Sequence, residues 1–217
     1  MGYIQSGAGI HKLTVGEEFD AARITIFPRD VVGSYVLSAA TGGIAGGTGA
    51  GSVLATFKNS GSNQIIIRTI KIGIQTTTGY GANNGIRFSS YFVRNSFTQG
   101  TTNGTAVTLT GNNDKKRTTG MATTTASVVM CTTTGITGDT ATGEDTTPFA
   151  TALFVLLTTV GTTPDAGWVD LYTADWAEFP IVLAPNEGFR IKNVTAFPAT
   201  GVVSLMLKIN YDELTSY

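Results

Sequence analysis

Apolar and polar residues alternate along much of the chain, in short runs that turn-forming residues separate. The last run, residues 201–213, shows this most clearly, because every second residue from Val203 to Tyr211 is apolar. The residues on its apolar side are Val203, Leu205, Leu207, Ile209 and Tyr211. Alternation with a period of two is typical of a strand with one buried and one wet face. The run therefore predicts a long strand.

The same pattern predicts further strands along the chain. They cover residues 23–28, 34–40, 52–59, 64–78, 86–97, 105–110, 125–131, 179–184 and 188–193. Within 64–78, the spacing places Ile66 on the same apolar face as Ile70. Arg68 interrupts this face, so we expect it to lie near a strand end or to pair with an acid.

Three segments do not follow the alternating pattern. Residues 149–159 are apolar throughout, which fits either a buried strand or a short buried helix, and the surrounding strands favour a strand. Residues 132–148 contain few apolar side chains and predict a long polar loop, either mobile or an interaction surface. The glycine-rich residues 41–51 predict a flexible loop or a tight crossing.

The fold class follows from many short strands, polar turns and the lack of any convincing long helix. We expect an all-β protein, an antiparallel β-sandwich of jelly-roll-like form with an extended N-terminal arm. Residues 1–30 form the predicted arm. Residues 31–217 form a single β-sandwich domain with long Gly/Thr-rich loops.

Composition narrows the classes of partner. The 217 residues are only 13% charged and carry a net charge of −1, so no overall field attracts nucleic acid or an anionic membrane. The basic run at 115–117 is flanked by turn residues and predicts a solvated loop. One cysteine excludes an intrachain disulfide, and no signal peptide or membrane span is recognisable. We therefore expect synthesis in a reducing cytoplasm.

Residues capable of chemistry are few. The single histidine, His11, lies in the predicted arm, and the single cysteine, Cys131, ends an apolar strand. Neither has the partners of a catalytic triad or of a zinc site. The glycine-rich loop lacks the lysine and the spacing of phosphate-binding motifs. Glu187 lies in the segment 184–188, where a turn residue accepting backbone N–H bonds is favoured over a catalytic carboxylate.

Acidic residues gather in two predicted loops and leave two weaker hypotheses. The first loop holds Asp139, Glu144 and Asp145, and the second holds Asp165, Asp170, Asp175 and Glu178. Calcium binding or glycoside hydrolysis would need several of these carboxylates to converge. Trp168 and Trp176 flank the second loop and fit either packing or carbohydrate binding. We assign no catalytic, cofactor-binding or metal-binding residue, and we expect no enzyme.

Three motifs resemble a family of tailed-bacteriophage virion structural proteins. They are "RNSF" at 94–97, which carries Asn95 as an insertion, "GTAVTLTGNNDKKR" at 104–117, and "LAPNEGF" at 183–189. The resemblance extends over about residues 33–213. It implies a capsid decoration or cement protein of jelly-roll-like form, located in the virion and made in the host bacterial cytoplasm.

The same resemblance implies particular partners. They are the major capsid protein or other virion proteins, together with further copies of the chain in a homo-oligomer, for which a trimer is one form. The alternative function is that of a phage tail protein or of a receptor- or carbohydrate-binding β-sandwich module.

Overall fold

The computed structural model of the protein describes most of the chain. It covers residues 4–6, 9–11, 31–109, 114–116, 121–160, 167–174 and 180–215. The described residues form strands and turns without any helix, so none of them belongs to a helix that crosses a membrane. The expected arm, residues 1–30, lies largely outside these ranges. Its described part is the hairpin of β1 (Ile4–Ser6) and β2 (Gly9–His11).

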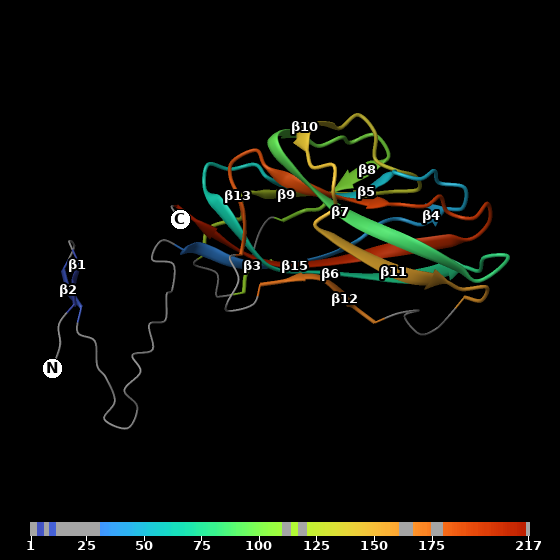
Figure 1. The fold of residues 1–217 in the computed structure, drawn as a ribbon, viewed down its shortest axis with the longest axis horizontal. Helices are drawn as coiled ribbons and strands as arrows, with labels where there is room; N and C mark the ends of the chain where they lie inside the picture. Colours follow the sequence, from blue (N-terminus) through green and yellow to red (C-terminus); the bar gives the residue numbers. More distant parts are fainter. Residues whose placement is uncertain are drawn as a thin grey trace, which may run out of the picture.

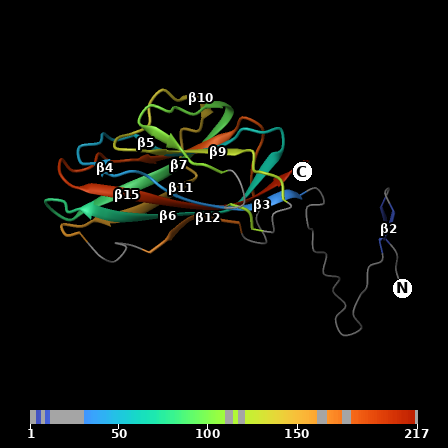
Figure 2. The ribbon, with the colours of Figure 1, turned by 180° about the vertical axis from the view of Figure 1, so that it is seen from behind.

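The other strands form two antiparallel sheets that pack face to face (Figures 1 and 2). The first, here called the β15 sheet, has the order β12-β6-β15-β3, with β13 beside β6 and β4 beside β15. Its strands are β3 (Val31–Ala40), β4 (Ile44–Ala45), β6 (Gln64–Thr78), β12 (Val169–Thr173), β13 (Ile181–Leu183) and β15 (Val202–Leu214).

The second, here called the β14 sheet, has the order β10-β7-β14-β5-β9-β8, with β11 also paired to β7. Its strands are β5 (Val53–Asn59), β7 (Asn84–Thr98), β8 (Gly104–Ala106), β9 (Ala126–Cys131), β10 (Thr140–Glu144), β11 (Ala150–Leu156) and β14 (Gly188–Asn193). β10 and β11 share one edge, because each pairs with a different half of the long strand β7.

The strand order is that of a jelly roll. Eight of the strands carry this pattern, and in chain order they are β3, β5, β6, β7, β11, β12, β14 and β15. In the β15 sheet, the first, eighth, third and sixth of them lie side by side in that order. In the β14 sheet, the second, seventh, fourth and fifth lie side by side in that order. This is the double-sheet arrangement in which paired strands fold over into two Greek keys. The predicted all-β sandwich of jelly-roll form is therefore confirmed.

The core lies between the two sheets and is built from the alternating strands. All five apolar residues predicted for β15 are fully buried, as are Phe189 and Ile191 of β14. Phe57 stacks on Phe189 at 5.3 Å within the β14 sheet and meets the edge of Tyr211 from the other sheet, also at 5.3 Å. Aromatic rings in such pairs contribute beyond their buried area.

A bulge changes one prediction in β6. The register with β15 shifts between Asn210 and Tyr211, opposite Arg68, so the alternation changes phase there. Ile65 and Ile67, rather than Ile66, belong with Ile70 to the hydrophobic cluster between the sheets, although Ile66 is itself buried. The placement of Ile66 on the core face was therefore wrong, because a bulge adds one unpaired residue.

Segments that looked like loops or simple strands also differ. β10 forms within the predicted polar loop 132–148 and pairs with β7. Of the predicted strand 105–110, the structure describes residues 105–109, and only the first two of these belong to the short strand β8. Residues 149–159 contain the strand β11 rather than a helix, but its burial alternates, and Leu153 and Val155 face outward. The apolar run is therefore half exposed in the single chain.

Candidate functional site

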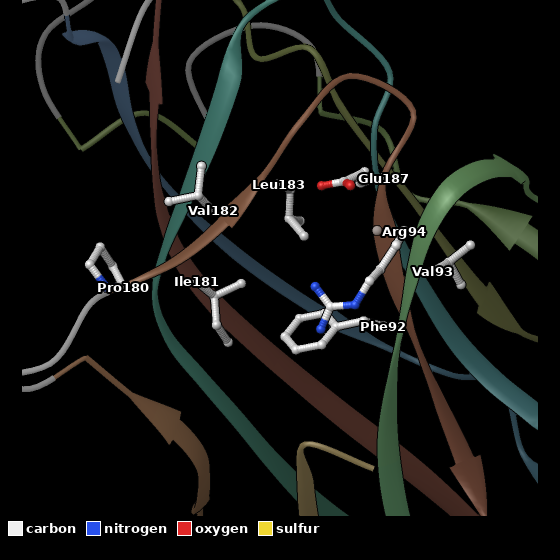
Figure 3. A pocket seen from close by; sticks show the side chains of 9 residues that line it. Phe92, Val93, Arg94, Pro180, Ile181, Val182, Leu183 and Glu187 are labelled. Atoms are coloured by element: carbon white, nitrogen blue, oxygen red, sulfur yellow. The ribbon is translucent and has the colours of Figure 1, made fainter. Parts of the chain in front are cut away.

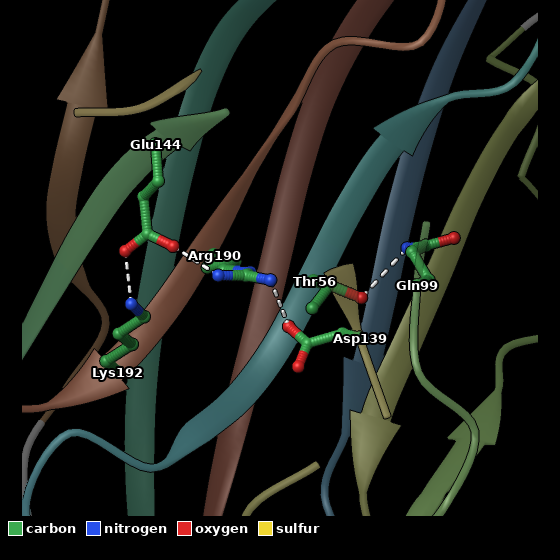
Figure 4. Close-up of polar contacts among 6 residues, drawn as sticks. All are labelled: Thr56, Gln99, Asp139, Glu144, Arg190 and Lys192. Atoms are coloured by element: carbon green, nitrogen blue, oxygen red, sulfur yellow. Dashed lines mark hydrogen bonds and ion pairs between the residues drawn. The ribbon is translucent and has the colours of Figure 1, made fainter. Parts of the chain in front are cut away.

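The outer face of the β14 sheet carries a cluster of buried charges (Figure 4). Because Phe189 and Ile191 face the core, the intervening Arg190 must project from the opposite face. There it is covered by residues 132–149, here called the covering segment, and its side chain is only 9% exposed. Its guanidinium lies over the ring of Phe97 at 5.2 Å, a cation–π contact.

Two acids of the covering segment meet Arg190. Oδ2 of Asp139 lies 2.5 Å from Nη2 of Arg190. This oxygen accepts no hydrogen bond, so the contact is an ion pair whose geometry is not that of a hydrogen bond. Glu144 accepts from Nη1 of Arg190 and, through its other oxygen, from Nζ of Lys192. The acids of this segment are therefore paired with bases, which argues against their joint use as calcium ligands or glycosidase carboxylates.

The other predicted acids are also placed individually. Asp145 accepts from Arg94 in a two-pronged contact on the surface, and this hydrogen bond holds the pKa of Asp145 below its ordinary value. Asp170 pairs with Lys71 at 2.8 Å. Asp165, Asp175 and Glu178 lie outside the described residues. Within the described ranges, no group of three or more His, Cys, Asp or Glu side chains is arranged to hold a metal ion.

Glu187 has the turn role that the sequence predicts. It follows Asn186, which has a positive φ of 67°, in the turn between β13 and β14. The side-chain Oε2 of Glu187 accepts a hydrogen bond from the backbone N–H of Ala184 at 2.8 Å. The backbone N–H of Glu187 donates to the carbonyl of Ala184 at 3.1 Å. The carboxylate thus closes the turn that leads into Arg190. The prediction that Glu187 accepts a backbone N–H bond is confirmed.

Arg68 also has the predicted partner, since it donates to Asp212 of β15 at 2.8 Å. Cys131 is buried at the end of β9, and burial raises the pKa of its thiol to about 12, so it is held as the unreactive thiol. His11 belongs to β2, and its side chain lies outside the described parts.

The basic run 115–117 was predicted to be a solvated loop, but its described part is attached to the β15 sheet. The backbone of residues 114–116 pairs with β3, although Lys116 itself is exposed. Arg117 lies outside the described residues.

A second buried polar cluster lies inside the sandwich, where sequence reasoning placed none. Glu213 of β15 is fully buried and accepts from the hydroxyl of Thr124 and the backbone N–H of Thr125. Burial, followed by the charges of Glu213 and Asp114, raises the pKa of the nearby Tyr35 to about 12. The strict alternation of β15 ends at this residue, which is the one sequence signal of an unusual position.

Two hollows indent the described surface. One, of about 230 Å³, lies between β13 and β7 (Figure 3), where Arg94 lies over the ring of Phe92. It is smaller than usual ligand sites. The other is open, has a volume of about 600 Å³, and is lined by residues 47–53, Asn103 and 134–139. Its lining joins the glycine-rich loop to the start of the covering segment.

Two of the exposed large apolar side chains lie next but one to each other on the edge strand β11. Leu153 is 66% exposed and Val155 is 49% exposed, on the outer face of the β14 sheet. On the neighbouring strand β7, Arg87 lies opposite Leu153 and Gly85 lies opposite Val155. On the other side of β7, the backbone N–H of Val194 donates to the carbonyl of Arg87. Trp168 is about half exposed beside β12, and Trp176 lies outside the described residues.

The chain was compared with known proteins by sequence and by structure. No protein-family model, no curated protein and no solved structure matches it. The resemblance to bacteriophage structural proteins therefore stays a prediction, and function has to be argued from the fold and its surfaces.

Proposed function

We propose that the chain is a non-enzymatic structural protein of a virion, a capsid decoration or cement protein that stabilises the shell by bridging its subunits. The observation that carries the proposal is the jelly-roll topology, an architecture used by viral capsid domains. Lectins and cupins share the architecture. The three motifs at 94–97, 104–117 and 183–189 favour the virion among these possibilities.

The internal use of charge supports a structural role. Asp139 and Glu144 are committed to Arg190 and Lys192, where they fasten the covering segment to the sheet. Side chains fixed in this way give a rigid outer face. Rigid partners lose less conformational entropy when they bind, so such a face suits permanent attachment to a large assembly.

A cement protein acts by mass action. If it binds the assembled shell in preference to free capsid subunits, each occupied site stabilises the shell by RT ln(1 + [L]/Kd), about 2.7 kcal/mol at a hundredfold excess over Kd. We propose that residues 1–30 supply much of the contact by adding a strand to a capsid subunit. A chain that starts at residue 31 should then bind shells at least tenfold more weakly.

The decisive experiment is quantitative mass spectrometry of purified particles of the virus that encodes the chain. The measured quantity is the number of copies per major capsid subunit. A ratio near a simple fraction of one supports decoration of the shell. A few copies per particle assign the protein to the tail or connector, and absence from the particle rejects a virion role.

Carbohydrate or receptor binding is the second candidate, and the open hollow of about 600 Å³ favours it. Its lining of glycine backbone and Asn103 offers hydrogen-bonding groups to a polar ligand. A glycan array with the full chain tests this function, with Asn103→Ala as the site variant. Binding lost in the variant supports the site, whereas an array without hits rejects the candidate.

A further inference from the structure

Most strand edges in the described residues are protected. Unpaired edges invite pairing with other chains, and proteins blunt them by short length, bulges, charges or cover. β4, β8 and β13 have only two or three residues. β10 and β12 are bulged. β3 is partly covered by residues 114–116, which exchange backbone hydrogen bonds with it.

β11 has none of these protections. It is seven residues long, pairs with β7 in an unbroken register, and contains no charged residue, proline or glycine. Among the described strands, β7 is its only ladder partner, so no described strand is hydrogen-bonded to its other edge, although β12 of the other sheet approaches it. Leu153 and Val155 add apolar side chains to this edge, although exposed apolar residues at an open edge favour aggregation. The combination indicates an edge that is covered in the working protein.

We propose that β11 pairs with β11 of a second copy, antiparallel and edge to edge, about a two-fold axis at Leu153. The two β14 sheets then form one continuous sheet, and the interface is isologous. This inference is independent of whether the assembly decorates a capsid.

The sequence of β11 is complementary to itself in this register. With Leu153 opposite its own copy, all seven residues of each strand are paired. On the core side, Ala152 faces the partner's Phe154 and Ala150 faces the partner's Leu156, so a small side chain meets a large one in each pair. On the outer side, Leu153 meets the partner's Leu153, and Thr151 meets the partner's Val155. A slip by one residue would place core residues opposite outer ones, which disfavours that register, and a slip by two would leave two residues of each strand unpaired.

Charge does not oppose the pairing. The nearest cation, Arg87, lies one strand inward from Leu153 in each copy. The two Arg87 residues are thus three strand spacings apart, about 14 Å, which exceeds the screening length of about 8 Å at physiological ionic strength. β11 itself carries no charge, so no electrostatic repulsion opposes the pairing of the two β11 strands.

The first test is the oligomeric state of the full chain by sedimentation velocity. A single pair of seven-residue strands is a small interface, so we expect a concentration-dependent dimer with Kd on the order of 10 µM. Leu153→Lys should raise Kd by on the order of 100-fold, because two leucines leave the interface and two ammonium groups face each other. Val160→Lys is the matched control, since Val160 is 62% exposed but lies beyond the strand. It should leave Kd unchanged.

The second test reports the register by cysteine cross-linking. Leu153→Cys should give a covalent dimer with a short thiol cross-linker, because opposite residues of an antiparallel pair lie about 5 Å apart. Thr151→Cys and Val155→Cys should each cross-link poorly alone but efficiently when mixed. Val160→Cys should not cross-link. The native Cys131 is buried and contributes no background.

Three results would overturn the proposal. One is a chain that stays monomeric at high concentration and is not cross-linked through position 153. Another is an oligomer that Leu153→Lys leaves intact. The third is a monomer whose binding to shells is abolished by Leu153→Lys, which would assign the strand to another virion protein. The copy number in particles, which tests the decoration function, is measured separately and does not depend on these outcomes.

Discussion

Replacing Arg190 by alanine should lower the free energy of unfolding by about 3 kcal/mol, because two acids of the covering segment lose their shared cation. Asp139 would keep no basic partner among the described residues, whereas Glu144 would keep Lys192. The side chains of both acids are largely buried, so water replaces the lost guanidinium only in part. The covering segment would then still be held by the pairing of β10 with β7, by its other backbone hydrogen bonds and by the buried Ile136.

The magnitude follows from charge and burial. Two unit charges about 4 Å apart attract by about 4 kcal/mol at an effective dielectric constant of 20. Part of this attraction offsets the desolvation of the groups themselves, and removing one partner of a buried pair costs about 3 to 5 kcal/mol in total. Because Asp139 and Glu144 keep some exposure, we expect the lower end of this range. For a chain of this size, the melting temperature should fall by about 6 to 12 °C.

The assay is unfolding in guanidinium chloride, followed by tryptophan fluorescence. Arg94→Ala is the matched control, because Arg94 also pairs with an acid of the covering segment but its side chain is 59% exposed. That variant should cost less than about 1 kcal/mol, as exposed ion pairs do. If Arg190→Ala costs no more than Arg94→Ala, the argument that buried pairing fastens the covering segment is wrong.

A double substitution separates charge from packing. In the Arg190→Ala background, Asp139→Asn removes the carboxylate that has lost its partner, so it should recover stability rather than cost more. We expect the two substitutions to be non-additive by about 1 kcal/mol or more, as for residues in one network. Strict additivity would indicate that the cost of Arg190→Ala comes from lost contact with Phe97 instead.

Three further outcomes are expected. Glu187→Ala should cost about 1 kcal/mol in chemical unfolding, because the N–H of Ala184 loses its acceptor, whereas Glu187→Gln should cost less. Cys131 should resist iodoacetamide at pH 8 until the chain unfolds, since burial raises its pKa to about 12. Arg94→Ala should raise the pKa of Asp145 toward its ordinary value of 3.8, which an NMR titration can measure. In the wild type this pKa is lowered, so the ion pair stabilises the fold at neutral pH, and this stabilisation is lost as the pH falls through the lowered pKa.

The sandwich was predictable because its longest strands each bury one face. In β15 the apolar residues recur at every second position, and burial follows them without exception from Val203 to Tyr211. An alternation with a period of two can be recognised within a single strand, so each strand can be predicted without knowing its neighbours. The turn at Glu187 was predictable for the same reason, since its hydrogen bond joins residues three apart.

The charged cluster was not predictable, because it depends on contacts between distant segments. Arg190 alternates with Phe189 and Ile191 as a surface residue would, yet the covering segment buries it. Nothing within residues 132–148 indicates that Asp139 and Glu144 meet a base some fifty residues later. The bulge at Arg68 was missed similarly, because its position is fixed by the register with β15.

The apolar run 149–159 connects the sequence to the proposed assembly. Strands that are buried on both faces have continuous apolar sequences, whereas strands with one wet face alternate. The run is continuously apolar from Ala152 to Leu157, but in the single chain β11 buries one face and exposes Leu153 and Val155 on the other. The sequence is thus that of a strand with more burial than one copy provides. A partner at the β11 edge accounts for both observations, because it would pair the open edge and bring the exposed side chains of the two copies into contact.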